Sequence, residues 1–194
     1  MRFAYLKTLP AASALLALAA LVLSPPASAA AWRINPARTT IDFTIDAVGF
    51  PRTEGRFHRF EGHISVDFEH PSRSSVAFHV QSQSVDVGSA SFSDYLRSAA
   101  FLDSADHPSI DFVSTSVEKI SDHAVRVEGN LTLLGVTKPI SVEIAVQRED
   151  EGGRQRLAFR AKTHIDRLEF GMNSGFPLVS RDVELKIFSE AEAS

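Results

Sequence analysis

Seven histidines are the residues of this chain best suited to metal binding or acid–base chemistry, but their spacing favours neither role. Zinc sites are commonly built from imidazoles in patterns such as H-x-H, H-x-x-x-H or H-E-x-x-H, and the sequence contains none of these. It also lacks the G-x-S-x-G, P-loop and G-x-G-x-x-G patterns of hydrolases and nucleotide-binding proteins. We therefore predict no catalytic residue, no metal site and no cofactor.

Four charged residues are the next candidates for a functional role. Asp94 and Arg97 lie in a segment with helical spacing, and Arg167 and Asp182 flank a loop late in the chain. Such groups can rim a cavity and contact a polar head group, or they can form ion pairs that hold a helix and a loop in place. Partly exposed ion pairs more often organise a loop than bind a ligand, and both interpretations stay open here.

Phenylalanine dominates the aromatic residues, with fourteen Phe against two Tyr and one Trp. Because Phe has no polar group, this composition predicts a dry interior, which suits either tight packing or an apolar ligand. Gly62 and Gly129 share the inward phase of their segments, where a missing side chain leaves room or permits a bend. Four of the Phe lie on the apolar phase of alternating segments: Phe43, Phe78, Phe112 and Phe159.

Apolar and polar residues alternate along most of the chain, which is typical of half-buried antiparallel strands. The clearest case is 125–146, a long hairpin joined by 134–139. Only 89–103 has helical spacing, and we expect a helix over 91–100 with Ser91 or Ser93 as its cap. The tail after Ser189 is expected to fray. The predicted strands are 39–48, 54–69 with a bulge near Gly62, 76–81, 109–117, 124–134, 138–147, 154–164 and 183–187, with a tight turn at 151–153.

These eight predicted strands, joined mostly by short turns, indicate an all-β fold with one short helix. Closing the meander into an eight-stranded antiparallel barrel removes the exposed edges of an open sheet. A barrel of this size either just fills with its own side chains or holds one small ligand. The sequence predicts the barrel and leaves that choice open.

Residues 1–29 have the pattern of a secretory signal peptide. Arg2 and Lys7 form the basic start, 11–23 is an apolar run too short to span a bilayer, and Ala27-Ser28-Ala29 is a cleavage site. We therefore expect a periplasmic protein whose single folded domain is residues 30–194. Cleavage removes two of the twenty basic residues and none of the twenty-four acidic ones, which leaves a net charge of −6.

This mildly acidic balance argues against nucleic acid as a partner, since nucleic acid requires a basic face. It argues equally against electrostatic docking on anionic lipid head groups. The absence of cysteine excludes disulfides, thiol catalysis and cysteine-ligated metal centres.

Four sequence motifs, in order, resemble those of the YceI-like family of secreted bacterial lipocalin-like proteins. The run 129–139 is similar to that family's G-x-L-T-x-x-G-V-T-K-P signature, and 55–62 is similar to its G-x-F-x-x-F-x-G hairpin. The segment 94–112 resembles its helical crossing and next strand, and 167–172 resembles its R-x-x-F-G-M loop. The resemblance covers about Trp32 to Glu190.

The resemblance implies a binding or carrier protein that holds a long-chain isoprenoid, a quinone or a fatty-acid-like lipid inside the barrel, without catalysis. A transient membrane contact and a homodimer are compatible with it. The implied ligand-binding residues are Phe43, Phe78, Phe112, Leu131, Leu133, Ile144 and Phe159 along the channel, with Asp94 and Arg167 near its mouth.

Two other functions remain open at this point. The first is a filled barrel that acts as an interaction module and docks on a membrane or a redox partner protein. The second is a lipid-modifying enzyme, which would need an acid and a base converging inside the cavity, and the sequence identifies no such pair.

Overall fold

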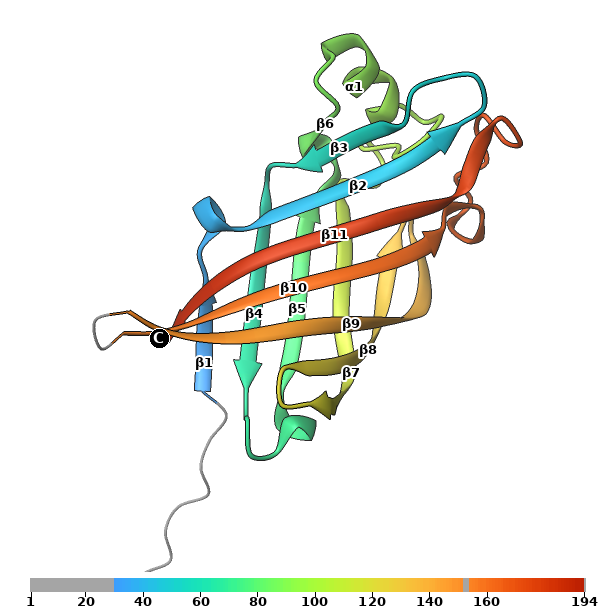
Figure 1. Cartoon of the computed structure of the whole chain (residues 1–194). Coiled ribbons are helices and arrows are strands. Elements are labelled where there is room, and N and C mark those ends of the chain that lie inside the picture. The colour runs from blue at the N-terminus through green and yellow to red at the C-terminus, as the bar shows by residue number, and fades with distance from the viewer. Residues whose placement is uncertain (1–29, 152–153, 194) are drawn as a thin grey trace, which may run out of the picture.

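The computed structural model describes residues 30–151 and 154–193, which form one antiparallel sheet of eleven strands with one α-helix (Figure 1). The predicted signal peptide and the Gly152-Gly153 turn lie outside the described residues. The strands are β1 (Ala30–Ile34), β2 (Thr40–Ala47), β3 (Thr53–Phe57), β4 (Phe60–Val66), β5 (Ser75–Gln81), β6 (Val85–Asp86), β7 (Ser109–Ser121), β8 (Ala124–Leu133), β9 (Val136–Glu151), β10 (Arg154–Asp166) and β11 (Val179–Ala193). The helices are α1 (Ala90–Arg97) and four short 3-10 helices, η1 (Pro36–Arg38), η2 (Pro71–Arg73), η3 (Ser82–Ser84) and η4 (Arg167–Phe170).

The sheet closes because β1 pairs with two strands, β4 and β11. The order β1-β4-β5-β7-β8-β9-β10-β11 therefore returns to β1 as a ring of eight strands, while β2, β3 and β6 continue from the other end of β11 (Figure 1). This arrangement confirms the predicted all-β, lipocalin-like barrel with one helix. The predicted strand count was wrong, since the described residues form eleven strands rather than eight.

One reason for the larger count is that the segment expected as a single bulged strand, 54–69, breaks in two. The break falls at His58 and Arg59, after which β4 pairs with β1 and β5, whereas β3 pairs with β2 and β6. The backbone N–H of His58 donates to the carbonyl of Ser84 (3.2 Å), so the break leaves this donor satisfied. The change of phase after Phe57 therefore comes from a break between two strands and not from the expected bulge.

The C-terminal strand also runs further than predicted. We expected the chain to fray after Ser189, but β11 continues to Ala193. Ala191 is fully buried and is paired with Leu157 on β10 and with Ile34 on β1. The end of β11 is held by its pairing with both β10 and β1. An Ala- and Glu-rich sequence does not reveal these two pairings.

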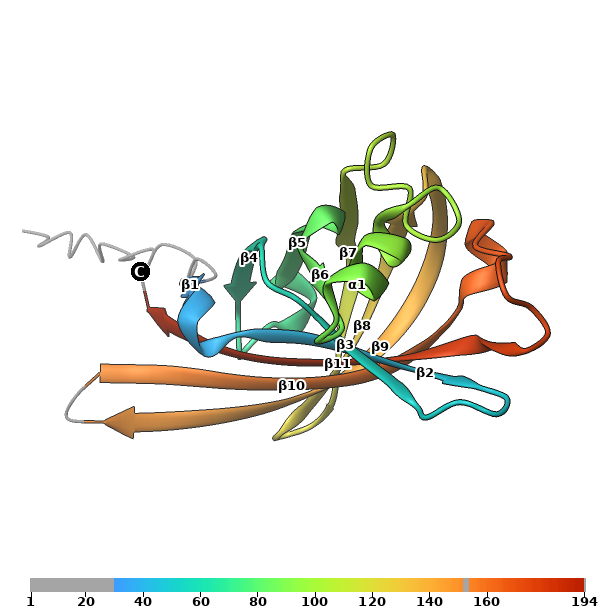
Figure 2. The ribbon, with the colours of Figure 1, turned by 90° about the horizontal axis from the view of Figure 1, so that it is seen from above.

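The helix α1 follows β6 and lies over one end of the barrel (Figures 1 and 2). Its N-cap is Ser89, whose side chain makes no capping hydrogen bond. The expected caps, Ser91 and Ser93, lie inside the helix, where the buried Ser93 hydroxyl accepts a hydrogen bond from the backbone N–H of Val87 (3.1 Å). This bond ties the helix to the strand that precedes it.

Candidate functional site

The interior of the barrel is hollow and contains a cavity of about 1070 Å³. Two of the predicted residues, Leu131 and Leu133, are buried in its wall, while the other five apolar residues are only half-buried although they face inward. Their remaining exposure is to the empty interior, so the barrel is not filled by its own side chains. The seven predicted apolar residues that line the cavity are Phe43, Phe78, Phe112, Leu131, Leu133, Ile144 and Phe159.

Three strand glycines make room for three of these rings. A methyl group at Gly55 would lie 2.3 Å from Cζ of Phe43, and one at Gly129 would lie 2.4 Å from Cζ of Phe112. At Gly62 a methyl group would meet Cδ1 of Ile34 first and would lie 3.0 Å from Cε1 of Phe78. The rings thus lie against the backbone of a neighbouring strand instead of projecting into the interior, which is the close approach that glycine permits.

The space predicted at Gly62 and Gly129 therefore exists, but the Phe112 ring occupies it at Gly129, and Ile34 and the Phe78 ring occupy it at Gly62. The role of Gly55 was missed in the sequence analysis, because only the pairing of β2 with β3 places this residue opposite Phe43.

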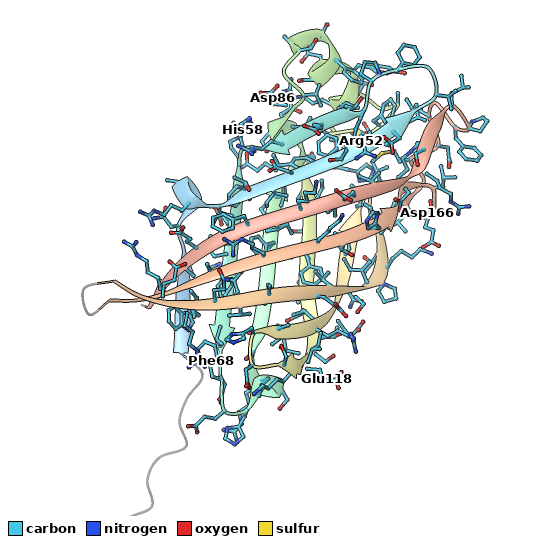
Figure 3. All side chains as sticks on the ribbon, viewed as in Figure 1. Arg52, His58, Phe68, Asp86, Glu118 and Asp166 are labelled. Atoms are coloured by element: carbon cyan, nitrogen blue, oxygen red, sulfur yellow. The ribbon has the colours of Figure 1, made fainter. Side chains whose placement is uncertain are left out.

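At one end the cavity is bounded by three segments that are far apart in the sequence. They are the β2–β3 connection, the helix α1 and the loop between η4 and β11, which we call the late loop (residues 171–178). In Figure 3 the labels Arg52 and Asp166 mark this end, and Phe68 and Glu118 mark the other. The helix and the loop that we expected near a mouth thus border the same cavity.

Arg167 lines the cavity near this end but uses its guanidinium to hold the backbone of the late loop. Its Nε donates to the carbonyl of Ser180 (2.7 Å), its Nη2 to that of Val179 (2.9 Å), and its Nη1 to that of Met172. The residue is fully buried, and this burial lowers the pKa of Arg167 from its usual value. It makes no ion pair with Asp182, so the two charged residues considered together in the sequence do not form a pair.

Asp94, the other charged residue predicted near the mouth, is not part of the cavity wall. It is exposed and forms an ion pair with Arg97 across one helical turn (2.7 Å). Arg97 in turn donates to the carbonyls of Gln83 (2.9 Å) and Val85 (2.6 Å), which lie just before and at the start of β6. This pair holds α1 against the chain that leads into it.

The opposite end of the cavity includes charged side chains that the sequence pattern does not reveal. Asp67 lies in the wall there, and its Oδ1 accepts hydrogen bonds from the backbone N–H of His70 (2.8 Å) and Glu69 (3.0 Å). These bonds lower the pKa of the Asp67 carboxyl. Nearby, the guanidinium of Arg148 lies 3.5 Å above the centre of the Phe68 ring.

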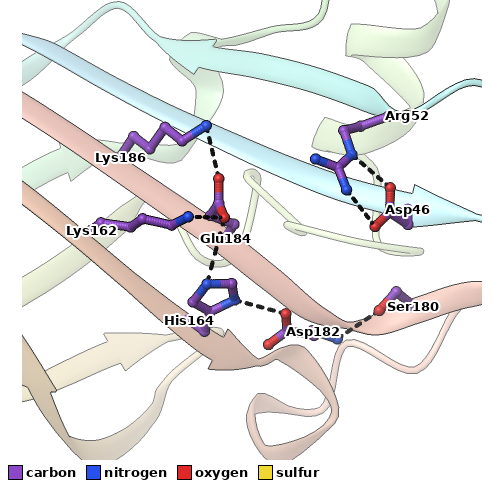
Figure 4. A network of polar contacts seen from close by, with 8 residues as sticks. All are labelled: Asp46, Arg52, Lys162, His164, Ser180, Asp182, Glu184 and Lys186. Carbon is purple, nitrogen blue, oxygen red and sulfur yellow. Dashed lines mark hydrogen bonds and ion pairs between the residues drawn. The ribbon is translucent and has the colours of Figure 1, made fainter.

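A polar network lies outside the cavity, on the outer face of β10 and β11 (Figure 4). Glu184 accepts from Lys162 (2.7 Å) and Lys186 (2.8 Å), and these bonds lower the pKa of Glu184 to about 2. His164 contacts Asp182 through Nδ1 (2.7 Å) and Glu184 through Nε2 (3.5 Å). Because side chains alternate between the two faces of β10 and β11, these charged side chains lie on the outer face and the apolar ones face the cavity.

Within 30–151 and 154–193, no group of three or more His, Asp or Glu side chains is arranged to hold a metal ion. In the same residues, no helix is long and apolar enough to cross a membrane.

The comparisons with known sequences agree with the geometry. A family model described as the YceI-like domain matches residues 32–191. Protein YceI of Salmonella arizonae is 36% identical over 152 residues, which cover 77% of this chain and 79% of that protein. The UPF0312 protein ECA1782 of Pectobacterium atrosepticum has the same identity and coverage.

Solved structures show the same fold. BcnA of Burkholderia cenocepacia has a TM-score of 0.74 at 21% identity, and the match covers 81% of this chain and 98% of BcnA. A polyisoprenoid binding domain from Saccharophagus degradans, implicated in plant cell wall breakdown, has a TM-score of 0.68 at 16% identity and is covered to 99%, against 86% of this chain. At these identities the likeness establishes the shared barrel architecture.

Proposed function

Because this chain belongs to the YceI-like domain family, we propose that it is a periplasmic carrier that holds the apolar part of a long lipid inside the barrel, without catalysis. The lipid class that suits the site is an isoprenoid, a quinone with an isoprenoid tail, or a long acyl chain. The proposal is consistent with the polyisoprenoid binding described for the Saccharophagus degradans domain.

The observation that carries this proposal is the shape of the cavity. On β8 alone, lining residues run from Ala124 to Leu133, nine steps along one strand, which corresponds to about 30 Å at the usual rise of a strand. Dividing the volume of about 1070 Å³ by this length gives a mean cross-section of about 36 Å². A long, narrow and mostly apolar space fits an extended hydrocarbon chain better than a compact metabolite.

The energetics favour transport over capture of free ligand. Burying one CH₂ group is worth roughly 0.8 kcal/mol relative to water, so a long chain would bind very tightly if water were its alternative. A lipid's alternative is a bilayer, where its chain is already dry. Exchange between the bilayer and the barrel is then close to balanced, as a carrier requires.

The test is native mass spectrometry of residues 30–194 purified from the periplasm, followed by solvent extraction and identification of any lipid. We expect one lipid per chain in the wild type and its loss in Phe78→Asp, which places a charge in the wall. Val113→Asp is the matched control, because Val113 lies beside this site on β7 but is 55% exposed on the outer face.

Ile144→Trp serves as a second variant, since it narrows the cavity without introducing a charge. A wild type that carries no lipid and takes up no added polyprenyl, quinone or acyl lipid would refute the proposal. Equal lipid occupancy in both folded cavity variants would show that the lipid lies elsewhere.

The periplasmic location is part of the proposal and rests on residues 1–29. Fractionation of the native host followed by N-terminal sequencing is expected to give a mature chain that begins at Ala30. A full-length chain in the cytoplasmic fraction would contradict this.

A further inference from the structure

Exposed apolar side chains are concentrated at the end of the barrel that α1 and the late loop border. Nine large apolar side chains among the described residues are exposed, and six of them belong to the three segments around this end. We call these six the apolar rim: Val48, Phe50, Phe92, Tyr95, Phe176 and Leu178. An exposed cluster of this kind marks an interaction surface, whereas single exposed apolar residues need no explanation.

Two of the three segments form one continuous part of this rim. The backbone N–H of Val48, at the end of β2, donates to the carbonyl of Leu178 in the late loop (2.8 Å). The side chains of Val48, Phe50 and Leu178 are 69%, 74% and 62% exposed. Both connections project beyond the barrel wall in Figure 2, and their exposed side chains are accessible from outside the barrel.

The third segment, α1, carries the aromatic part of the rim. Phe92 and Tyr95 are stacked with their ring centres 6.5 Å apart, and Tyr95 meets the buried Phe101 edge-on at 5.2 Å. Phe50, Phe92 and Tyr95 also line the cavity. The apolar rim therefore shares three of its six side chains with the wall of the cavity.

The charges beside the rim are neutralised in pairs. Arg52 binds Asp46 through two hydrogen bonds (2.8 and 3.0 Å), and Arg181 binds Asp166. The rim therefore offers apolar area without an excess of positive charge, which suits a zwitterionic lipid surface and not an anionic one. The rim consists of loop tips on separate segments, so a protein partner would need a surface complementary in shape to all of them. Lipid molecules in a bilayer can instead rearrange around the rim.

We propose that the apolar rim inserts into the surface of a zwitterionic phospholipid bilayer and opens the cavity toward it. A lipid can then pass between bilayer and barrel without its chain crossing water. The passage of a lipid between bilayer and barrel rests on the proposed carrier function, whereas the insertion of the rim does not depend on it.

The test is co-sedimentation of residues 30–194 with vesicles of phosphatidylethanolamine and phosphatidylcholine, at low and at high salt. We expect salt-insensitive binding that falls by about tenfold for each rim side chain removed in Phe50→Ser and Leu178→Ser. The matched control is Val113→Ser with Ile120→Ser, which removes two exposed apolar side chains of β7 away from the rim and is expected to leave binding unchanged. Absence of vesicle binding by the wild type, an equal loss in the control, or capture only by a protein partner would overturn the proposal.

The depth of insertion has its own readout because the sequence contains a single tryptophan. Trp32 lies buried in β1, far from the rim (Figure 1), so brominated lipids should leave its fluorescence unchanged. In Phe50→Trp the added fluorescence should be strongly quenched, and unquenched emission would contradict insertion at this loop.

Lipid loading separates this inference from the carrier function. A Leu178→Ser variant that accepts a polyprenol added from ethanol, but no longer extracts it from vesicles, supports both, because Leu178 belongs to the rim and not to the cavity wall. Loading from ethanol in the wild type without any vesicle binding would leave the carrier function standing and remove the docking surface.

Discussion

Replacing Arg167 by methionine tests whether this residue organises the end of the barrel or serves the ligand. The structure gives its guanidinium three backbone carbonyls, those of Met172, Val179 and Ser180, and full burial. Leaving a buried acceptor without its partner costs about 1–3 kcal/mol. Because water can enter and a buried charge is removed, we take the lower bound for each carbonyl, which gives about 3 kcal/mol in total.

A loss of this size is measurable by thermal and urea unfolding of residues 30–194 followed by circular dichroism. For a domain of this size it corresponds to a fall in Tm of about 6–12 °C. Arg167→Lys should recover only part of the loss, because a single ammonium cannot reproduce the fork of donors that a guanidinium presents. Hydrogen exchange should also accelerate at the N–H of Val179, which donates to Gly175 within the same region (2.8 Å).

The matched control is Arg181→Met, because Arg181 belongs to the same end of the barrel but is 60% exposed where it binds Asp166. Exposed ion pairs contribute little, so its Tm should stay close to that of the wild type. Equal Tm values for Arg167→Met and Arg181→Met would refute the structural role. A folded, equally stable Arg167→Met that loses lipid would instead return Arg167 to the ligand-binding role expected from the sequence.

Three further predictions concern the cavity wall, acid stability and the packed end of the barrel. Gly55→Ala should push the Phe43 ring inward, which should cost about 1–3 kcal/mol in the free energy of unfolding and shorten the longest lipid seen by native mass spectrometry. Adding Phe43→Leu should restore both the stability and the lipid length. The pKa of Glu184 is about 2 in the fold against a usual value of 4.5, so its contribution to stability is present above pH 4.5 and is lost as the pH falls toward 2. Glu184→Gln should therefore flatten the fall of Tm over that pH window. An unchanged slope of Tm against pH would contradict this prediction. Leu157→Ala should destabilise the fold by about 2–5 kcal/mol, since Leu157 is 1% exposed, yet leave lipid binding intact because this residue does not line the cavity.

The sequence was sufficient to predict the class of fold and most strands, because alternation of apolar and polar residues is a local signal. It failed where a strand is defined by its partners. The two-residue strand β6 has too few residues for any pattern, and β1 is recognisable only from its pairing with β4 and β11. The same reason explains the end of β11, whose small and acidic residues form a strand because two neighbours hold it.

The residues of the candidate site also differ in whether a local pattern or a tertiary contact defines them. All seven apolar residues predicted along the channel line the cavity, since the inward phase of a strand is readable from its sequence. The polar end around Asp67 could not be predicted, because the contact of Arg148 on β9 with Phe68, next to Asp67, exists only in the folded barrel. Arg167 was identified as important, but burial and three carbonyl partners decide what it does, and these are properties of the folded chain.

A hollow and a filled barrel have the same alternation of residues, so what distinguishes them here is where the aromatic rings lie. Gly55, Gly62 and Gly129 belong to the motifs 55–62 and 129–139, and each receives a phenylalanine ring against its backbone. A side chain at Gly55 or Gly129 would displace the Phe43 or Phe112 ring, and one at Gly62 would displace Ile34 and crowd Phe78, so each would reduce the space that remains. The glycines of these motifs thus have a physical meaning that spacing alone does not reveal: they thin the wall, so that a chain rich in phenylalanine can enclose a cavity of about 1070 Å³ instead of closing on itself.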